Sequence, residues 1–111
     1  MVNIKIKPAH GGQGGWMTAT GHAGTDLLCN TVTAICECLA VNLEQCWDVR
    51  LTRNVTPGNY RLGWSKSERR SRGNDRANRA AGFAYNGLKA LAEAYPKNVR
   101  VEWIREQEGT R

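Results

Sequence analysis

A histidine and a cysteine stand seven positions apart in the segment GHAGTDLLC, and together they have the residue types of a thiol nucleophile and its base. If a helix begins just before Cys29, the free backbone N–H groups and the dipole at its start favour the thiolate. The imidazole of His22 would then form the thiolate–imidazolium pair that makes a cysteine nucleophilic near neutral pH. The same N–H groups would hold the oxyanion that forms when a thiolate attacks an amide carbonyl. The spacing therefore indicates acyl-transfer chemistry.

The spacing also permits a plainer interpretation, in which Cys29 is a buried residue that follows a histidine by chance. Cysteine often packs as a small hydrophobe. Cys36 lies two helical turns after Cys29 on nearly the same face, whereas Cys38 points away, and we expect both to be structural. His10 is the competing base, but it stands beside two glycines in a turn that would orient it poorly.

The four cysteines do not have the spacing of a typical zinc site. Their pattern is C-x6-C-x-C-x7-C, whereas structural zinc sites usually pair cysteines as C-x2–4-C. We therefore expect no metal site. The start, MVNIKIKP, has no signal-peptide apolar region, so the expected compartment is the cytoplasm, where thiols stay reduced. No apolar run approaches the roughly 20 residues of a membrane helix, so no membrane contact is expected.

Both residues of the pair are expected at a junction between a strand and a helix. Residues 2–7 alternate apolar and polar side chains, and residues 16–20 predict a second strand that pairs with them as a hairpin. Asp26 is the predicted N-cap of a helix of about seventeen residues, because its carboxylate can accept from free N–H groups. His22 shares its strand parity with Trp16, and which parity faces the helices stays open; a twist at Gly21 would re-aim the histidine. The apolar face of this helix consists of Leu28, Val32, Ile35, Leu39 and Leu43.

The rest of the chain predicts three more strands and a second helix. Residues 47–52 and 60–64 alternate as strands on either side of a turn at 56–59, which has Pro-Gly at its centre. Pro96 ends the second helix, and residues 99–103 form the closing strand. The order ββαββαβ predicts a single two-layer α+β domain over residues 1–111, with a mainly antiparallel sheet and both helices on one face. The stripe of the second helix is Ala81, Ala84, Leu88, Leu91 and Tyr95.

The formal net charge of +6 is concentrated in residues 66–79, KSERRSRGNDRANR, which carry six basic and two acidic side chains. Such a run is suited to a contact with nucleic acid or an acidic partner. A solvated loop that leads into a helix explains it equally well, and no aromatic residues interleave with the arginines as they do in single-strand binders. The contact would use Lys66, Arg69, Arg70, Arg72, Arg76 and Arg79.

Residues 21–34, GHAGTDLLCNTVTA, resemble the signature of a protease family. They are similar to the pattern GHA, a glycine-containing loop and D-[IV]-V-C-A-A-V-S of the ribosomal-processing cysteine proteases, the Prp family. The pair Tyr95-Pro96 after the second helix and the closing V-x-V-x-W strand agree with that family over nearly the whole chain. GHA followed by D-x-x-C is the most specific part of the match.

The resemblance implies a homodimeric cytoplasmic cysteine endopeptidase that needs no cofactor. In bacteria such as Firmicutes, the family removes an N-terminal extension from a large-subunit ribosomal protein by cutting after an aromatic residue. By position, Cys29 would be the nucleophile and His22 the general base and acid. Helix-cap and supporting roles would fall to Asp26, Gly21, Gly24 and Thr33.

The chain departs from the family pattern around the cysteine. The loop between His22 and Cys29 is shorter, Asn30 and Thr31 replace small residues, and Thr33 replaces a serine. The short loop leaves the substrate open, so a phage relative that processes a capsid or scaffold protein is an alternative with the same chemistry. An alternative of another class is a non-catalytic basic domain associated with the ribosome or RNA, whose binding would depend steeply on salt and not on Cys29.

Overall fold

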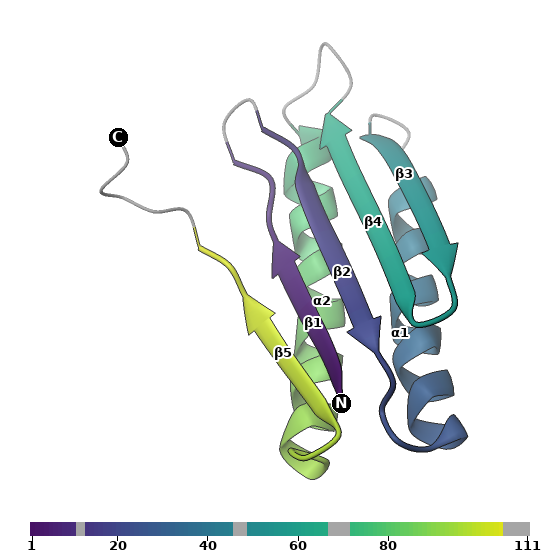
Figure 1. The fold of residues 1–111 in the computed structure, drawn as a ribbon. Coiled ribbons are helices and arrows are strands. Elements are labelled where there is room, and N and C mark those ends of the chain that lie inside the picture. Colours follow the sequence, from purple (N-terminus) through teal and green to yellow (C-terminus); the bar gives the residue numbers. More distant parts are fainter. Residues whose placement is uncertain (11–12, 46–48, 67–71, 106–111) are drawn as a thin grey trace.

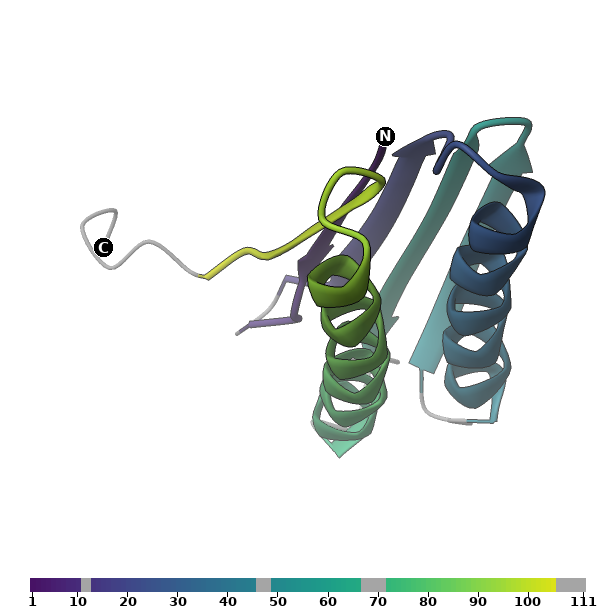
Figure 2. The same ribbon diagram turned by 90° about the horizontal axis from the view of Figure 1, so that it is seen from below.

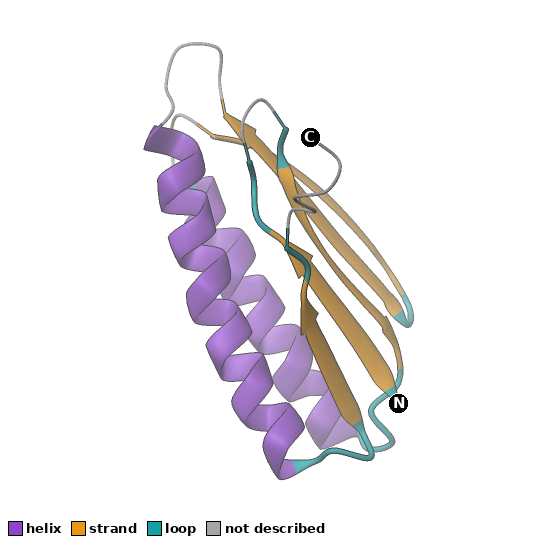
Figure 3. Ribbon diagram, turned by 90° about the vertical axis from the view of Figure 1, so that its left-hand side faces the viewer, coloured by secondary structure: helices purple, strands orange, loops and turns teal. Residues whose placement is uncertain are grey.

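The computed structural model describes residues 1–10, 13–45, 49–66 and 72–105 and has the predicted element order ββαββαβ. Both helices cover one face of the sheet and leave the other face open, which gives the two layers expected from the sequence (Figures 1–3). The elements are β1 (Val2–Lys7), β2 (Gly15–Gly21), α1 (Asp26–Glu44), β3 (Val49–Thr56), β4 (Asn59–Lys66), α2 (Arg72–Ala94) and β5 (Val99–Trp103).

The sheet has the strand order β3-β4-β2-β1-β5. Three of its pairings are antiparallel, and only β1 and β5 run parallel, so the prediction of a mainly antiparallel sheet is confirmed. The hairpin of β1 and β2 lies in the middle, while the hairpin of β3 and β4 forms one side (Figure 1). This order places the end of β2 beside the turn between β3 and β4. The two segments are in contact there, since the Gly21 N–H donates to the Gly58 carbonyl over 2.9 Å.

The core lies between the sheet and the two helices. Alternate residues of β1 and β2 point into it, including Ile4, Ile6 and Met17, which are at most 1% exposed. Trp16 and Thr18 have the opposite parity and are only partly covered. The parity that the sequence left open is therefore settled: Met17 and Ala19 face the helices.

The second helix is longer than its apolar stripe predicted. It begins at Arg72, so part of the basic segment is helical rather than a loop. Its early buried positions include Ala77, whose small side chain gives a weak hydrophobic signal among charged neighbours. Tyr95, expected at the end of the stripe, instead follows the helix and is 46% exposed.

The third strand also extends further than predicted, to Thr56, because it pairs with β4 up to the Pro57-Gly58 turn. Gly58 has a φ of +70°, which glycine adopts without strain at this turn position. Residues 47 and 48, which the sequence assigned to the start of this strand, lie outside the described residues.

The first helix is long and apolar enough, by length and composition, to resemble a membrane-crossing segment. The expectation from the sequence that no apolar stretch approaches the length of a membrane helix was therefore wrong for residues 26–44. The core accounts for much of its apolar character, because one side of α1 packs under the sheet. Its buried residues are Leu28, Val32, Cys36, Leu39, Ala40 and Leu43.

Candidate active site

The histidine of the predicted pair leaves the sheet at a glycine. Gly21 ends β2 with a φ of +97°, and a Cβ there would lie 2.4 Å from the Met1 carbonyl oxygen, so a larger residue would not fit. This backbone turn re-aims His22, which lines a pocket on the helix side although strand alternation would point it to the open face. The ring lies against the β3–β4 turn, since a Cβ at Gly58 would lie 3.3 Å from Nε2. His22 stays exposed to solvent.

The cysteine of the pair lies in the first turn of α1, as the sequence predicted. The N-cap, however, is Thr25 and not Asp26: the Thr25 hydroxyl accepts from the Leu28 N–H over 3.2 Å. Asp26 is the first helical residue, where its charge still favours the helix dipole. The prediction chose Asp26 as the better capping type, but Thr25 has the extended backbone that an N-cap needs, with φ −134° and ψ 152°. Cys29 is half-buried.

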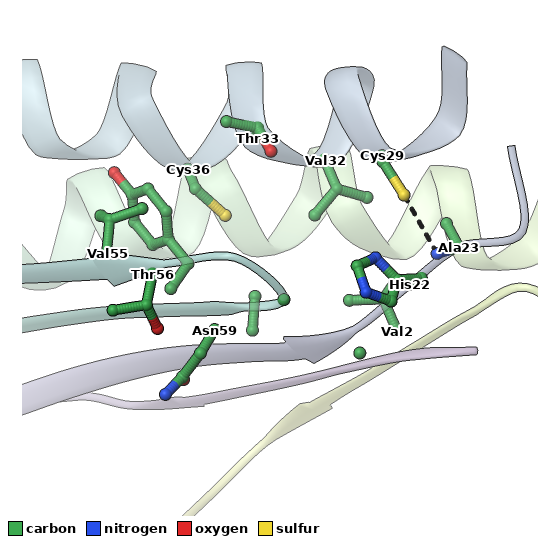
Figure 4. A pocket seen from close by; sticks show the side chains of 14 residues that line it. Val2, His22, Ala23, Cys29, Val32, Thr33, Cys36, Val55, Thr56 and Asn59 are labelled. Atoms are coloured by element: carbon green, nitrogen blue, oxygen red, sulfur yellow. Dashed lines mark hydrogen bonds between the residues drawn. The ribbon is translucent and has the colours of Figure 1, made fainter. Parts of the chain in front are cut away.

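The sulfur of Cys29 accepts a hydrogen bond from the Ala23 N–H over 3.2 Å, the dashed line in Figure 4. Ala23 is 1% exposed, and its carbonyl accepts from Asn98 Nδ2 over 2.7 Å. The Ala23 backbone is thus held between Asn98 and Cys29. Gly24 packs against the same side chain, because a Cβ there would come within 2.8 Å of Asn98 Nδ2. This loop therefore directs a backbone N–H donor at the sulfur.

His22 and Cys29 line the same cavity, which has a volume of about 130 Å³. The histidine reaches it from the end of β2 and the cysteine from α1, and both side chains lie at the same end of the cavity (Figure 4). Within the described part of the chain no hydrogen bond joins the two side chains. Thr33 also lines the cavity from α1, one turn beyond Cys29. The other lining residues are Val2, Ala19, Gly21, Ala23, Val32, Cys36, Val55, Thr56, Gly58, Asn59 and Tyr60.

Tyr60, which lines this cavity, belongs to a polar cluster with Glu37 and Arg53. The buried Tyr60 donates its hydroxyl to Glu37 on α1, and Arg53 on β3 donates to both oxygens of the same carboxylate, over 3.0 and 2.6 Å. Hydrogen bonds from Arg53 and from Tyr60 hold the pKa of Glu37 below its usual value. Burial raises the pKa of Tyr60, so its hydroxyl stays protonated and can donate. The cluster joins the β3–β4 hairpin to α1.

The remaining cysteines and the second histidine stand apart from this chemistry. Burial, with a smaller effect from the Glu37 charge, raises the pKa of Cys36 to about 12, so this thiol is not an available nucleophile. Cys38 is exposed on α1, and Cys46 lies outside the described residues. His10 forms a bridge with Gln13 in the turn between β1 and β2, at the opposite end of β2 from Gly21, so it does not compete with His22.

The described side chains form no candidate metal site. The described residues include no group of three His, Cys, Asp or Glu side chains that could hold a metal ion.

Residues 69 and 70 of the basic segment lie outside the described chain. Arg76 and Arg79 lie on α2 beside a groove that this helix shares with α1. A contact of this segment with nucleic acid or an acidic partner stays a prediction.

No family model matches the sequence, and no curated protein matches it. Solved structures do match over nearly the whole chain. The essential ribosomal processing protease Prp from S. aureus, in complex with a covalently linked product peptide, has a TM-score of 0.72 at 18% identity, with 94% of this chain and 100% of that chain covered. The same protease in complex with a substrate peptide has a TM-score of 0.71 at 17% identity and the same coverage. This chain has the fold of the Prp proteases.

The protein SMU.848 from Streptococcus mutans is also similar to this chain in structure, with a TM-score of 0.69 at 22% identity and 96% of each chain covered. Within this fold, sequence reasoning missed Thr25 and Asn98. Thr25 was visible as a possible N-cap in the sequence, but the neighbouring Asp26 is an equally suitable residue type and was chosen instead. Nothing in the sequence indicated Asn98, because it stands 75 residues from the Ala23 carbonyl that it holds.

Proposed function

We propose that the protein is a cysteine endopeptidase in which Cys29 is the nucleophile and His22 the general base and acid. The observation that carries this proposal is their shared pocket, in which the Cys29 sulfur accepts the Ala23 N–H. The Prp fold supports the proposal, because the S. aureus protease of this fold has been captured with a covalently linked product peptide. Such a link agrees with catalysis by a protein nucleophile.

The proposed reaction is acyl transfer in two steps. The Cys29 thiolate attacks the scissile carbonyl carbon, and the resulting tetrahedral intermediate breaks its C–N bond while the His22 imidazolium gives its proton to the leaving amine. Water then attacks the thioester with His22 as base, the C–S bond breaks, and the carboxylic acid product leaves. The thiolate and the imidazolium are regenerated. Each protonation role contributes roughly two to four orders of magnitude in rate.

The oxyanion would be held at the start of α1. The N–H groups of Leu28 and Cys29 are already bonded to the hydroxyl and the carbonyl of Thr25. In the described structure the N–H groups of Asp26 and Leu27 donate to no such acceptor, so we propose them as the donors to the oxyanion. A backbone donor that is aimed at the developing negative charge commonly lowers the barrier by about 3 kcal/mol.

The proposed substrate is a protein with an N-terminal extension, most directly a bacterial large-subunit ribosomal protein cut after an aromatic residue. The support is the Prp fold, together with the match of GHA and D-x-x-C on residues 21–29. A phage capsid or scaffold protein would use the same pocket and the same pair. The chemistry therefore does not depend on which of the two substrates is correct.

The test is incubation of the protein with a ribosomal protein precursor that carries its extension, with products identified by mass spectrometry. Wild type is expected to release the extension, and both Cys29→Ala and His22→Ala are expected to lose at least about 1000-fold in rate. Cys38→Ala is the matched control and should retain full activity, because Cys38 is exposed away from the pocket. Persistent cleavage by Cys29→Ala would remove the thiol from the mechanism and leave the basic binding domain as the better account.

The proposal includes a homodimer in the cytoplasm, as the Prp resemblance implies. Phe83 on α2 is 77% exposed and borders the groove between the two helices, which has a volume of about 480 Å³. Exposed aromatic side chains beside an apolar groove are typical of association surfaces. Sedimentation at micromolar protein should show a dimer, and a monomer would count against this part of the proposal.

A further inference from the structure

The outer edge of the sheet next to the candidate active site has unpaired backbone groups. β3 is an edge strand, and its pairing with β4 closes at the two-residue turn between Thr56 and Asn59. Residues of an antiparallel pair alternate between exchanging both hydrogen bonds and exchanging none. Counting from this turn, four residues of β3 direct their N–H and C=O groups away from β4 and have no backbone partner in the described chain: Val49, Leu51, Arg53 and Val55.

The same alternate residues point their side chains toward the helix layer. Arg53 reaches Glu37 on α1, and Val55 lines the cavity together with His22 and Cys29. Cross-strand neighbours lie on the same face of a sheet. A residue that paired with Val55 from outside would therefore direct its side chain toward the cavity.

We propose that an extended segment of the peptide substrate adds to the sheet as a further strand along the free edge of β3. This inference rests on the proposed function, because it takes the occupant to be the chain that Cys29 cuts. Pairing along β3 would place the peptide beside Val55 at the rim of the cavity that also holds the Cys29 sulfur. Main-chain hydrogen bonds would supply affinity that depends little on sequence, and the cavity would select one side chain.

Two observations favour a peptide at this edge. An eight-residue edge strand with exposed residues along its length is a template for pairing with another chain. Val55, near the end of β3 that borders the cavity, is 44% exposed. The other free edge, β5, lies across β1 and β2 from the β3–β4 hairpin and does not border the cavity (Figure 1). Of the two edges, only that of β3 is continuous with the pocket that holds the proposed nucleophile.

Amide hydrogen exchange followed by NMR tests the contact directly. The probe is a peptide that spans the cut site of the ribosomal precursor, added to Cys29→Ala protein. The amides of Leu51, Arg53 and Val55 should slow by about tenfold or more, because they gain hydrogen bonds. Those of Thr52 and Asn54, which already bond to β4, should change little, and so should β5. Equal protection of both sets, or none at Leu51 and Arg53, would overturn the inference.

A scan of N-methylated peptides tests the same contact through cleavage by the wild-type protein. Methylation removes a backbone donor, so positions at least three residues from the cut should show an alternating pattern, with losses of about tenfold at every second residue. A flat profile with cleavage intact would overturn the strand addition and leave the proposed function standing. No cleavage of the unmethylated peptide would overturn both. Protection of β3 that appears without peptide and grows with protein concentration would replace the peptide by a second copy of the chain.

Discussion

At the scale of single residues, the backbone of Ala23 links the parts of the candidate active site. Its N–H points at the Cys29 sulfur, and its carbonyl accepts a hydrogen bond from Asn98. Both peptide groups of the buried Ala23 are therefore held by hydrogen bonds. In the proposed mechanism, a donor held in this position stabilises the charge on the attacking sulfur more than a mobile donor would, because it needs no reorganisation. Asn98 thereby acts on the thiol through Ala23.

Asn98→Ala is expected to slow the reaction of Cys29 with iodoacetamide at neutral pH by roughly 2- to 10-fold, the effect of one lost hydrogen bond. The substitution leaves the Ala23 carbonyl without its hydrogen-bond donor. The Ala23 backbone is then less firmly held, so its N–H is less well aligned with the Cys29 sulfur. The measurement is the time course of labelling at each cysteine, read by peptide mass spectrometry. Because Cys38 is exposed and distant from Asn98 in the chain, its labelling is an internal control and should not change.

An unchanged rate at Cys29 would show that Ala23 holds its position without Asn98. A parallel slowing at Cys38 would indicate a general change in the fold rather than a local one. In wild-type protein Cys36 should be labelled last of the described thiols, since burial raises its pKa to about 12.

At the scale of elements, the start of α1 positions the thiol. The helix begins at Asp26, and Thr25 supplies both the capping hydroxyl for Leu28 and the carbonyl for the Cys29 N–H. The strand before it ends at Gly21, whose positive φ turns the chain toward the helix side. Two local features, a glycine and a cap, therefore bring His22 and Cys29 to one pocket.

Thr25→Ala should lower the free energy of unfolding by about 1 kcal/mol, because the helix loses its capping acceptor. Thr25→Ser keeps the hydroxyl and is the matched control, with little expected change. Asp26→Ala should cost less, about 0.5 kcal/mol, since Asp26 acts through the helix dipole alone. Urea unfolding followed by circular dichroism measures all three. A larger loss for Asp26→Ala than for Thr25→Ala would restore Asp26 as the cap.

The elements were largely predictable from the sequence, because each depends on local patterns. The alternation in residues 2–7 and the apolar spacing of α1 predicted these elements to within a few residues. The start of α2 was missed because its buried face there consists of alanines such as Ala77, set among arginines. Hydrophobic periodicity detects large side chains better than small ones.

At the scale of the whole molecule, the contacts that complete the site could not be predicted. Glu37, Arg53 and Tyr60 come from three different elements, and no local pattern in the sequence links them. The pairing of β1 with β5 likewise follows from the folded sheet, and it is what brings Asn98, just before β5, to the Ala23 loop. The pair of His22 and Cys29 was visible from its spacing, whereas the groups that hold it in place were not.

The buried thiol of Cys36 makes the stability of the whole fold sensitive to alkaline pH. Burial raises its pKa from 9.0 to about 12, so above pH 9 the unfolded chain loses this proton while the folded chain keeps it. The unfolded state then binds fewer protons, and the free energy of unfolding must fall as the pH rises, by at most about 1.4 kcal/mol per pH unit for this group. Below pH 9 the contribution is fully present and constant.

Cys36→Ala is therefore expected to flatten this alkaline decline, although it lowers stability at neutral pH by leaving a small cavity. The measurement is urea unfolding under reducing conditions from about pH 8 to about pH 10.5, with the slopes of the two proteins compared. Cys38→Ala is the control: its thiol is exposed, so its removal should leave the slope of the wild type. Burial also raises the pKa of Tyr60, and Cys36 contributes to that shift, so the slopes are compared below about pH 10, where Tyr60 adds little. Equal slopes for wild type and Cys36→Ala would mean that Cys36 ionises as freely in the fold as outside it. The packing around Cys36, which lines the same cavity as His22 and Cys29, would then be looser than the 0% exposure of this residue indicates.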